Sequence, residues 1–148
     1  MANVQSPINH PSAPESYDSQ PYVEDKSIAE MFLTTNGRLN RLRYFKRVLV
    51  LGVLMMIFST AIVMATMTPS GDNISTAGYV LFAVMCLVFA VPQFMLMIRR
   101  LHDLDKDGLF VLLTLIPAVN SIFALYLLFA PGTRGANKYG ADPIEGLG

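Results

Sequence analysis

The stretch VLVLGVLMMIFSTAIVMATMT, residues 48–68, decides the fold class of this chain, because none of its 21 side chains is charged. At a rise of about 1.5 Å per residue, a helix of this length crosses the roughly 30 Å hydrocarbon layer of a bilayer. Two further uncharged runs follow, at residues 79–98 and 109–130. A soluble helix bundle needs polar faces that these runs lack. The sequence therefore predicts an all-α membrane protein with about three transmembrane helices.

The composition agrees with this class. The chain of 148 residues is 53% hydrophobic and only 15% charged, which is too little charge to cover the surface of a soluble domain. Its net charge of zero gives no indication of a nucleic-acid partner. Cys86 has no second cysteine with which to form an intramolecular disulfide. Residues 1–47 contain no apolar stretch typical of a cleavable signal, so we expect the first span itself to direct insertion.

Composition divides the chain into four regions. Residues 1–26 are rich in Pro, Ser and Asn, and we expect a disordered polar tail there. A basic amphipathic segment follows at residues 27–47, and residues 48–131 form the membrane domain. Residues 132–148 are expected to be a glycine-rich polar C-terminal tail.

The segment at residues 27–47 is predicted to precede the first span as an amphipathic interfacial helix. Leu39, Leu42 and Phe45 would share one side of it. Five basic side chains, Arg38, Arg41, Arg43, Lys46 and Arg47, surround them. A helix that lies in the headgroup region has this composition.

The distribution of Lys and Arg predicts the orientation of the spans. Basic residues are abundant before the first span and in the loop at residues 99–108, and the loop at residues 68–78 has none. The positive-inside rule therefore places the N-terminus and the loop at residues 99–108 in the cytoplasm. Three full crossings would leave the C-terminal tail outside, although Arg134 and Lys138 favour the inside.

A re-entrant third segment would remove this conflict. Pro117 takes away a backbone donor near the middle of residues 109–130, and Asn120 is a polar residue close to it. Two half-helices could then begin and end on one side, provided that protein covers their exposed backbone groups. Because proline is tolerated in ordinary spans, we expect a full crossing and keep the re-entrant form as the alternative.

The polar loop DLDKDG, residues 103–108, has the first half of a calcium-binding loop. The second half is missing, because Thr114 stands where the bidentate Glu is required. We predict no metal site and no cofactor, with a weak divalent-cation site as the alternative. His102 and Asp103 would point about 100° apart on a helix, and no nucleophile motif accompanies them. The sequence thus predicts no enzyme.

Arginines at two membrane boundaries suggest binding instead. Arg99 and Arg100 at the cytoplasmic end of a helix complement its dipole and bind lipid phosphate well. Asp103, four residues after Arg99, is expected to be its partner. The candidate residues for binding anionic lipid or a partner protein are Arg38, Arg41, Arg99, Arg100, His102 and Asp103.

Four motifs in a fixed order carry a family resemblance. They are NGRLNRLRYF at residues 36–45, RRLHDLDKDG at 99–108, IP at 116–117 and GTRGANKYGADP at 132–143. With these letters the chain resembles the small bacterial membrane-protein family catalogued as domain of unknown function 805. The family often has aromatic residues after the glycine of the second motif, where this chain has Leu109 and Phe110. The resemblance implies a bacterial inner-membrane, multi-pass protein and implies no activity.

The sequence is compatible with three functions. The favoured one is a non-enzymatic membrane protein that binds anionic lipid or a partner, with a homo-oligomer as an open possibility. The second is a subunit of a small transporter or channel lined by Gln93 and Asn120 next to Pro92 and Pro117. The third is a lipid-headgroup enzyme that uses His102, Asp103 and Asp107 with a divalent ion.

Overall fold

The computed structural model describes residues 22, 24–68, 70–71 and 73–144. The described chain is helical, in the order α2, α3, α4, η1, α5. Most of the predicted disordered tail, residues 1–21 and 23, lies outside the described residues. The same is true of residues 145–148 of the predicted C-terminal tail.

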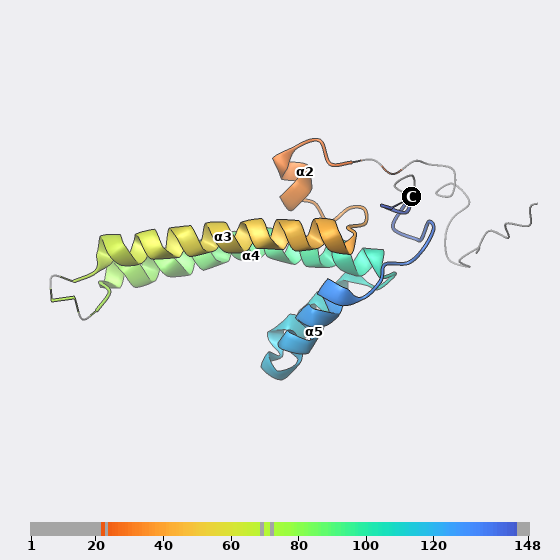
Figure 1. Ribbon diagram of the computed structural model, residues 1–148. Helices are drawn as coiled ribbons and strands as arrows, with labels where there is room; N and C mark the ends of the chain where they lie inside the picture. Colours follow the sequence, from red (N-terminus) through yellow and green to blue (C-terminus); the bar gives the residue numbers. More distant parts are fainter. Residues whose placement is uncertain (1–21, 23, 69, 72, 145–148) are drawn as a thin grey trace, which may run out of the picture.

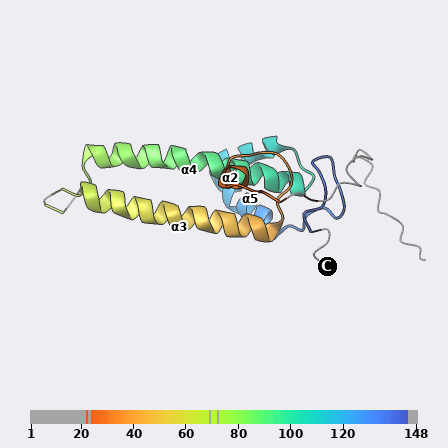
Figure 2. The same ribbon diagram turned by 90° about the horizontal axis from the view of Figure 1, so that it is seen from above.

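Two long helices dominate the fold. Helix α3 covers Arg41–Thr66 and α4 covers Thr76–Asp103, with 26 and 28 residues, or about 39 and 42 Å. They lie side by side along their length in both views (Figures 1 and 2). Where the two helices adjoin the segment that connects them, the Ser75 N–H donates to the Thr66 carbonyl at 2.8 Å. The first two predicted spans thus correspond to α3 and α4.

The apolar side chains of these helices face outward. Only 6% of the most apolar 18-residue window of α3 is buried, and 11% of the corresponding window of α4. A core helix of a soluble protein would be mostly buried. The two helices are therefore long, apolar and exposed enough to lie in a bilayer.

The predicted interfacial helix is not confirmed as a separate element. Helix α2, Ile28–Phe32, has only five residues, and residues 41–47 form the first two turns of α3. Leu39 lies in the extended stretch before α3 and is fully buried. Its N–H donates to the Arg99 carbonyl at 3.1 Å, and this contact holds the stretch against α4. Leu39 consequently does not share a surface face with Leu42 and Phe45, which are exposed.

The third apolar run does not form one continuous helix. It is divided into the 3₁₀ helix η1, Gly108–Leu115, and the α-helix α5, Pro117–Phe129. Ile116 between them has an extended backbone, and Pro117 occupies the first helical position of α5, where its missing N–H costs nothing. With 13 residues, α5 is about 20 Å long, shorter than a hydrocarbon layer. The prediction of a third full span is therefore not confirmed.

Helix η1 and α5 form a hairpin that begins and ends beside the last turn of α4 (Figure 1). The Thr133 N–H, just after α5, donates to the carbonyl of Asp103, the last residue of α4, at 2.8 Å. The buried apolar cluster is also at this end, and it contains Leu39, Tyr44, Leu96, Leu101, Leu104, Val111, Phe123 and Leu127. We call this the polar end, because the charged motifs of the sequence meet there.

Candidate functional site

The centre of the polar end is a buried carboxylate shared by two guanidiniums, here called the Asp103 cluster (Arg38, Arg100 and Asp103). Arg38 donates to Asp103 Oδ1 from Nε at 3.3 Å and from Nη2 at 3.2 Å. Arg100 Nη1 donates to Oδ2 of the same carboxylate. All three side chains are at most 2% exposed. Burial raises the pKa of Asp103, and both guanidiniums act in the opposite direction.

Arg38 connects this carboxylate to the C-terminal loop. Its Nη1 donates to the Gly135 carbonyl at 2.6 Å, and its Nη2 donates to Thr133 Oγ1 at 3.0 Å and to the Thr133 carbonyl. The loop passes so close that a Cβ at Gly132 would lie 2.9 Å from Asp103 Cγ. Every nitrogen of the Arg38 guanidinium therefore has an acceptor within the protein.

Arg100 caps the C-terminus of α5. Its Nε donates to the Leu127 carbonyl at 2.7 Å, and its Nη2 donates to the Ala130 carbonyl. The last carbonyls of a helix lack intrahelical partners and carry partial negative charge, so a cation is favourable there. Arg100 thus fixes the end of the hairpin to α4.

A second carboxylate is shared in the same way, in the Asp25 cluster (Asp25, Arg47 and Arg99). Arg99 Nη2 donates to Asp25 Oδ1 at 2.9 Å, and Arg47 Nη2 donates to Oδ2 at 2.6 Å. The two arginines also donate to carbonyls of α2, those of Glu30 and Met31. These contacts fasten the N-terminal segment across α3 and α4.

The predicted pairing of Arg99 with Asp103 is therefore wrong. Arg99 pairs with Asp25, and Asp103 pairs with Arg38 and Arg100. The physical reason is that Arg38 and Arg100 already occupy both oxygens of Asp103, whereas the Asp25 carboxylate lies within 2.9 Å of Arg99 Nη2. Asp25 was overlooked because composition assigned residues 1–26 to a disordered tail.

His102 packs against the C-terminal loop. Its ring stacks on Tyr139 with centroids 3.8 Å apart and planes 7° apart, and Asn137 Nδ2 donates to the His102 carbonyl at 2.9 Å. Within the described part of the chain, the His102 Nδ1 is buried without a hydrogen-bond partner. Burial lowers the pKa of the imidazole below its usual 6.5. Burial of the ring therefore favours the neutral form of His102.

The three aspartates of DLDKDG serve different purposes. Asp103 binds the two arginines, and Asp107 caps η1 by accepting from the Leu109 N–H at 2.8 Å. Asp105 occupies a turn with a positive φ of 55°. Across residues 24–68 and 73–144, no three His, Cys, Asp or Glu side chains lie close enough together to hold a metal ion.

Arg41 differs from the other predicted arginines, because it is exposed at the start of α3. Arg38, Arg99 and Arg100 are at most 3% exposed and bind protein groups. Besides Lys26 in the N-terminal segment, four more exposed cations lie outside the uncharged runs, and among the described residues none of these six cations pairs with a carboxylate. We call the five that lie beyond the N-terminal segment the rim cations: Arg41, Lys46, Lys106, Arg134 and Lys138.

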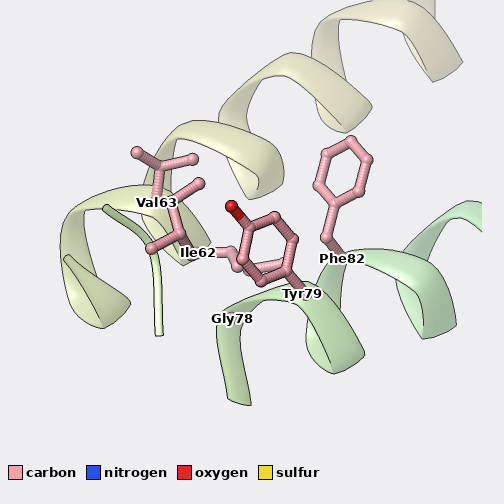
Figure 3. A pocket seen from close by; sticks show the side chains of 6 residues that line it. Ile62, Val63, Gly78, Tyr79 and Phe82 are labelled. Atoms are coloured by element: carbon pink, nitrogen blue, oxygen red, sulfur yellow. The ribbon is translucent and has the colours of Figure 1, made fainter. Parts of the chain in front are cut away.

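The opposite end of the helix pair has an apolar pocket of about 170 Å³ (Figure 3). Ile62 and Val63 of α3 and Tyr79 and Phe82 of α4 line it. Beside it the helices approach closely, because a Cβ at Gly78 would lie 2.8 Å from the Thr66 Cβ. This end contributes tight apolar packing to the fold.

Of the residues predicted from the sequence, the structure brings Arg38, Arg100 and Asp103 together, and it places the His102 ring on Tyr139. Sequence reasoning missed the residues that complete the site, Asp25, Thr133, Asn137 and Tyr139. A signal existed for the last three, because they belong to the motif GTRGANKYGADP, whose glycines predicted a compact turn.

The fold and this site define the class, an integral membrane protein with two long apolar helices and an internally cross-linked polar end. Residues 32–141 match the family described as "Protein of unknown function (DUF805)", and the chain belongs to that family.

Two curated relatives from Escherichia coli (strain K12) match a shorter part of the chain. Inner membrane protein YhaI is 41% identical over 56 residues, which are 38% of this chain and 48% of that protein. Inner membrane protein YhaH is 39% identical over 57 residues, 38% of this chain and 46% of that protein. The matches thus span about half the length of each relative. No solved structure matches the chain significantly.

Proposed function

We propose that this protein is a non-enzymatic protein of the bacterial inner membrane whose polar end binds anionic lipid headgroups. The observation that carries the proposal is the contrast between the buried arginines and the exposed cations of the polar end. The buried guanidiniums are occupied by internal acceptors, whereas the rim cations have no carboxylate partner among the described residues. Each cation near an anionic membrane surface contributes on the order of 1 kcal/mol to attraction. The names of the two relatives support the inner-membrane location.

The same proposal includes a topology. Helices α3 and α4 cross the bilayer, and the hairpin of η1 and α5 enters only the cytoplasmic half. The bond from Thr133 N–H to the Asp103 carbonyl and the capping of α5 by Arg100 support this, because both ends of the hairpin are tied to one end of α4. The rim cations then lie together on the cytoplasmic side, as the positive-inside rule favours.

The absence of catalysis is also part of the proposal. Both oxygens of Asp103 accept from guanidiniums, and Asp107 caps η1. His102 is stacked on Tyr139. A general base needs a free lone pair within reach of the proton it removes, and these contacts occupy both oxygens of Asp103 and Oδ1 of Asp107.

Lipid analysis of the purified protein tests the proposal. In detergent extracts, the ratio of phosphatidylglycerol to phosphatidylethanolamine bound to wild type is compared with that bound to a variant with all five rim cations changed to Gln. We expect the ratio to fall at least about fivefold, since the loss of five charges removes several kcal/mol of attraction. The matched control exchanges Arg for Lys and Lys for Arg at the same positions and keeps the ratio. An unchanged ratio in the neutral variant contradicts the proposal.

A transporter or channel subunit is the second candidate function. The observation that favours it is the break at Ile116 and Pro117, since discontinuous helices that stop near the bilayer midplane are typical of transport sites. The uncharged runs of α3 and α4 offer no ion relay of the usual kind. Purified protein in liposomes that passes no ion or small solute above empty vesicles would eliminate this candidate.

A further inference from the structure

An apolar groove lies on the exposed side of α3, just inside the polar end. It is a shallow, open groove with a volume of about 310 Å³, and it is lined by Phe45, Val48, Leu49, Gly52, Val53 and Met56. A Cβ at Gly52 would meet nothing within 4 Å, so the glycine leaves the middle of the groove open. From Phe45 to Met56 the helix rises about 16 Å. This is close to half of the roughly 30 Å hydrocarbon layer, the depth of one leaflet.

Arg41 stands at the head of the same side of α3. With about 100° of rotation per residue, Phe45 lies about 40° from Arg41 around the helix, and Gly52 about 20°. Side chains of a helix tilt toward its N-terminus, so the Arg41 guanidinium is directed away from the hydrocarbon and toward the headgroup level. A cation and an apolar groove are therefore aligned along one face.

The electrostatics at the start of α3 favour an anion beside Arg41. Arg41 is exposed and has no ion pair among the described residues. It is the first residue of a 26-residue helix, and helix N-termini carry partial positive charge and bind phosphate groups. The adjacent Asp103 cluster adds two guanidiniums against a single carboxylate. Charge of one sign is thus concentrated where a phospholipid phosphate would lie.

From this alignment we propose that α3 carries a site for one anionic phospholipid. The phosphate binds Arg41 and the start of α3, and one acyl chain lies in the groove opened by Gly52. The inference rests on the proposed function and makes it specific, because it assigns one rim cation to a defined lipid rather than to general attraction by the surface.

Native mass spectrometry of the full chain in detergent, titrated with phosphatidylglycerol, tests the site. We expect wild type to retain one lipid, and Arg41→Gln and Gly52→Leu each to weaken its apparent affinity at least about fivefold, or about 1 kcal/mol. Gly52→Leu fills the groove without changing the charge, and since no atom lies within 4 Å of its Cβ position the fold is expected to persist. The zwitterionic lipid phosphatidylcholine is expected to bind wild type and the two variants with the same affinity.

Lys46→Gln is the matched control, because it removes the same charge from the second turn of α3 but points about 140° away from Arg41. It should change the affinity less than twofold. An effect of Arg41→Gln without one of Gly52→Leu would overturn the acyl groove and leave the proposed headgroup attraction standing. A dimer of wild type that Gly52→Leu dissociates would show that the groove receives a second copy of the chain, and would overturn the lipid site. If neither Arg41→Gln nor Gly52→Leu changes the affinity for phosphatidylglycerol, the site does not exist. The lipid ratio of the variant without the five rim cations then decides the proposed function.

Discussion

Arg99 and Arg100 are neighbours in the chain, yet they bind segments from opposite ends of the sequence, residues 25–30 and residues 127–130. Arg99 binds Asp25 and the Glu30 carbonyl, whereas Arg100 binds the Leu127 and Ala130 carbonyls at the end of α5. Successive side chains on a helix point about 100° apart, so the two guanidiniums leave α4 on different sides. The last turn of α4 is therefore the junction at which the N-terminal segment, α3, the hairpin and the C-terminal loop are joined.

Asp103→Asn is expected to destabilise the protein strongly. It leaves two guanidiniums that are fully buried without their carboxylate, and breaking a buried pair costs about 3–5 kcal/mol. Thermal unfolding in detergent, followed by circular dichroism, measures the change. Glu24→Gln is the control, since the Glu24 side chain is 74% exposed in its pair with Arg43 and such a pair contributes at most about 1 kcal/mol. Equal unfolding temperatures for the two variants would contradict the prediction.

Asp25→Asn is expected to release the N-terminal segment without unfolding the helix pair. The carboxylate joins Arg47 and Arg99, and α2 alone is too short to be stable. Trypsin should then cleave after the exposed Lys26 several times faster than in wild type, as followed by mass spectrometry of the fragments. Glu24→Gln again serves as the control. An unchanged cleavage rate would mean that the Asp25 cluster does not hold the segment.

Gly132→Ala is expected to be destabilising although it adds a single methyl group. The new Cβ would lie 2.9 Å from Asp103 Cγ, so either the loop or the carboxylate must move away from Arg38. Overpacking of this kind costs about 1–3 kcal/mol. Gly52→Ala, whose Cβ would meet nothing within 4 Å, should be neutral or slightly stabilising. Similar unfolding temperatures for the two alanine variants would show that the close approach at Gly132 does not matter.

His102 is expected to make stability depend on pH. Burial lowers its pKa in the folded state below the value of about 6.5 in the unfolded state, so the unfolded chain takes up the proton first. Stability is then complete above pH 6.5 and falls as the pH decreases from there through the folded-state pKa. His102→Phe keeps an aromatic ring on Tyr139 and should lose less stability between pH 7 and pH 5. An identical loss in the variant would assign the pH dependence to other groups.

The proposed topology predicts a labelling pattern. In a Cys86→Ser background, single cysteines at Lys106, Lys138 and Ser70 are exposed to an impermeant thiol reagent in intact cells. We expect Ser70→Cys to be labelled from outside, and Lys106→Cys and Lys138→Cys only after the cells are opened, because Thr133 ties the loop before Lys138 to Asp103. Labelling of Lys138→Cys together with Ser70→Cys would establish a full third crossing instead.

The sequence alone determined the class and the two long apolar helices. Helices α3 and α4 contain nearly all of the uncharged runs at residues 48–68 and 79–98, because a long apolar run is a local property that any fold must accommodate. The sequence also indicated which residues form the polar end, since charged motifs could not lie within the uncharged runs. The family followed from the same letters.

Only the tertiary structure decided how the motifs combine. Arg38 lies 65 residues from Asp103 in the chain, and nothing local in either motif specifies that pairing over the expected one with Arg99. The hairpin of η1 and α5 was equally undecided, because the hydropathy of residues 109–130 fits a full span and a folded one alike. In the folded protein a buried cation lies at the end of α5. Arg100 supplies it through contacts 27 and 30 residues along the chain, a convergence that exists only once α4, α5 and the C-terminal loop have packed together.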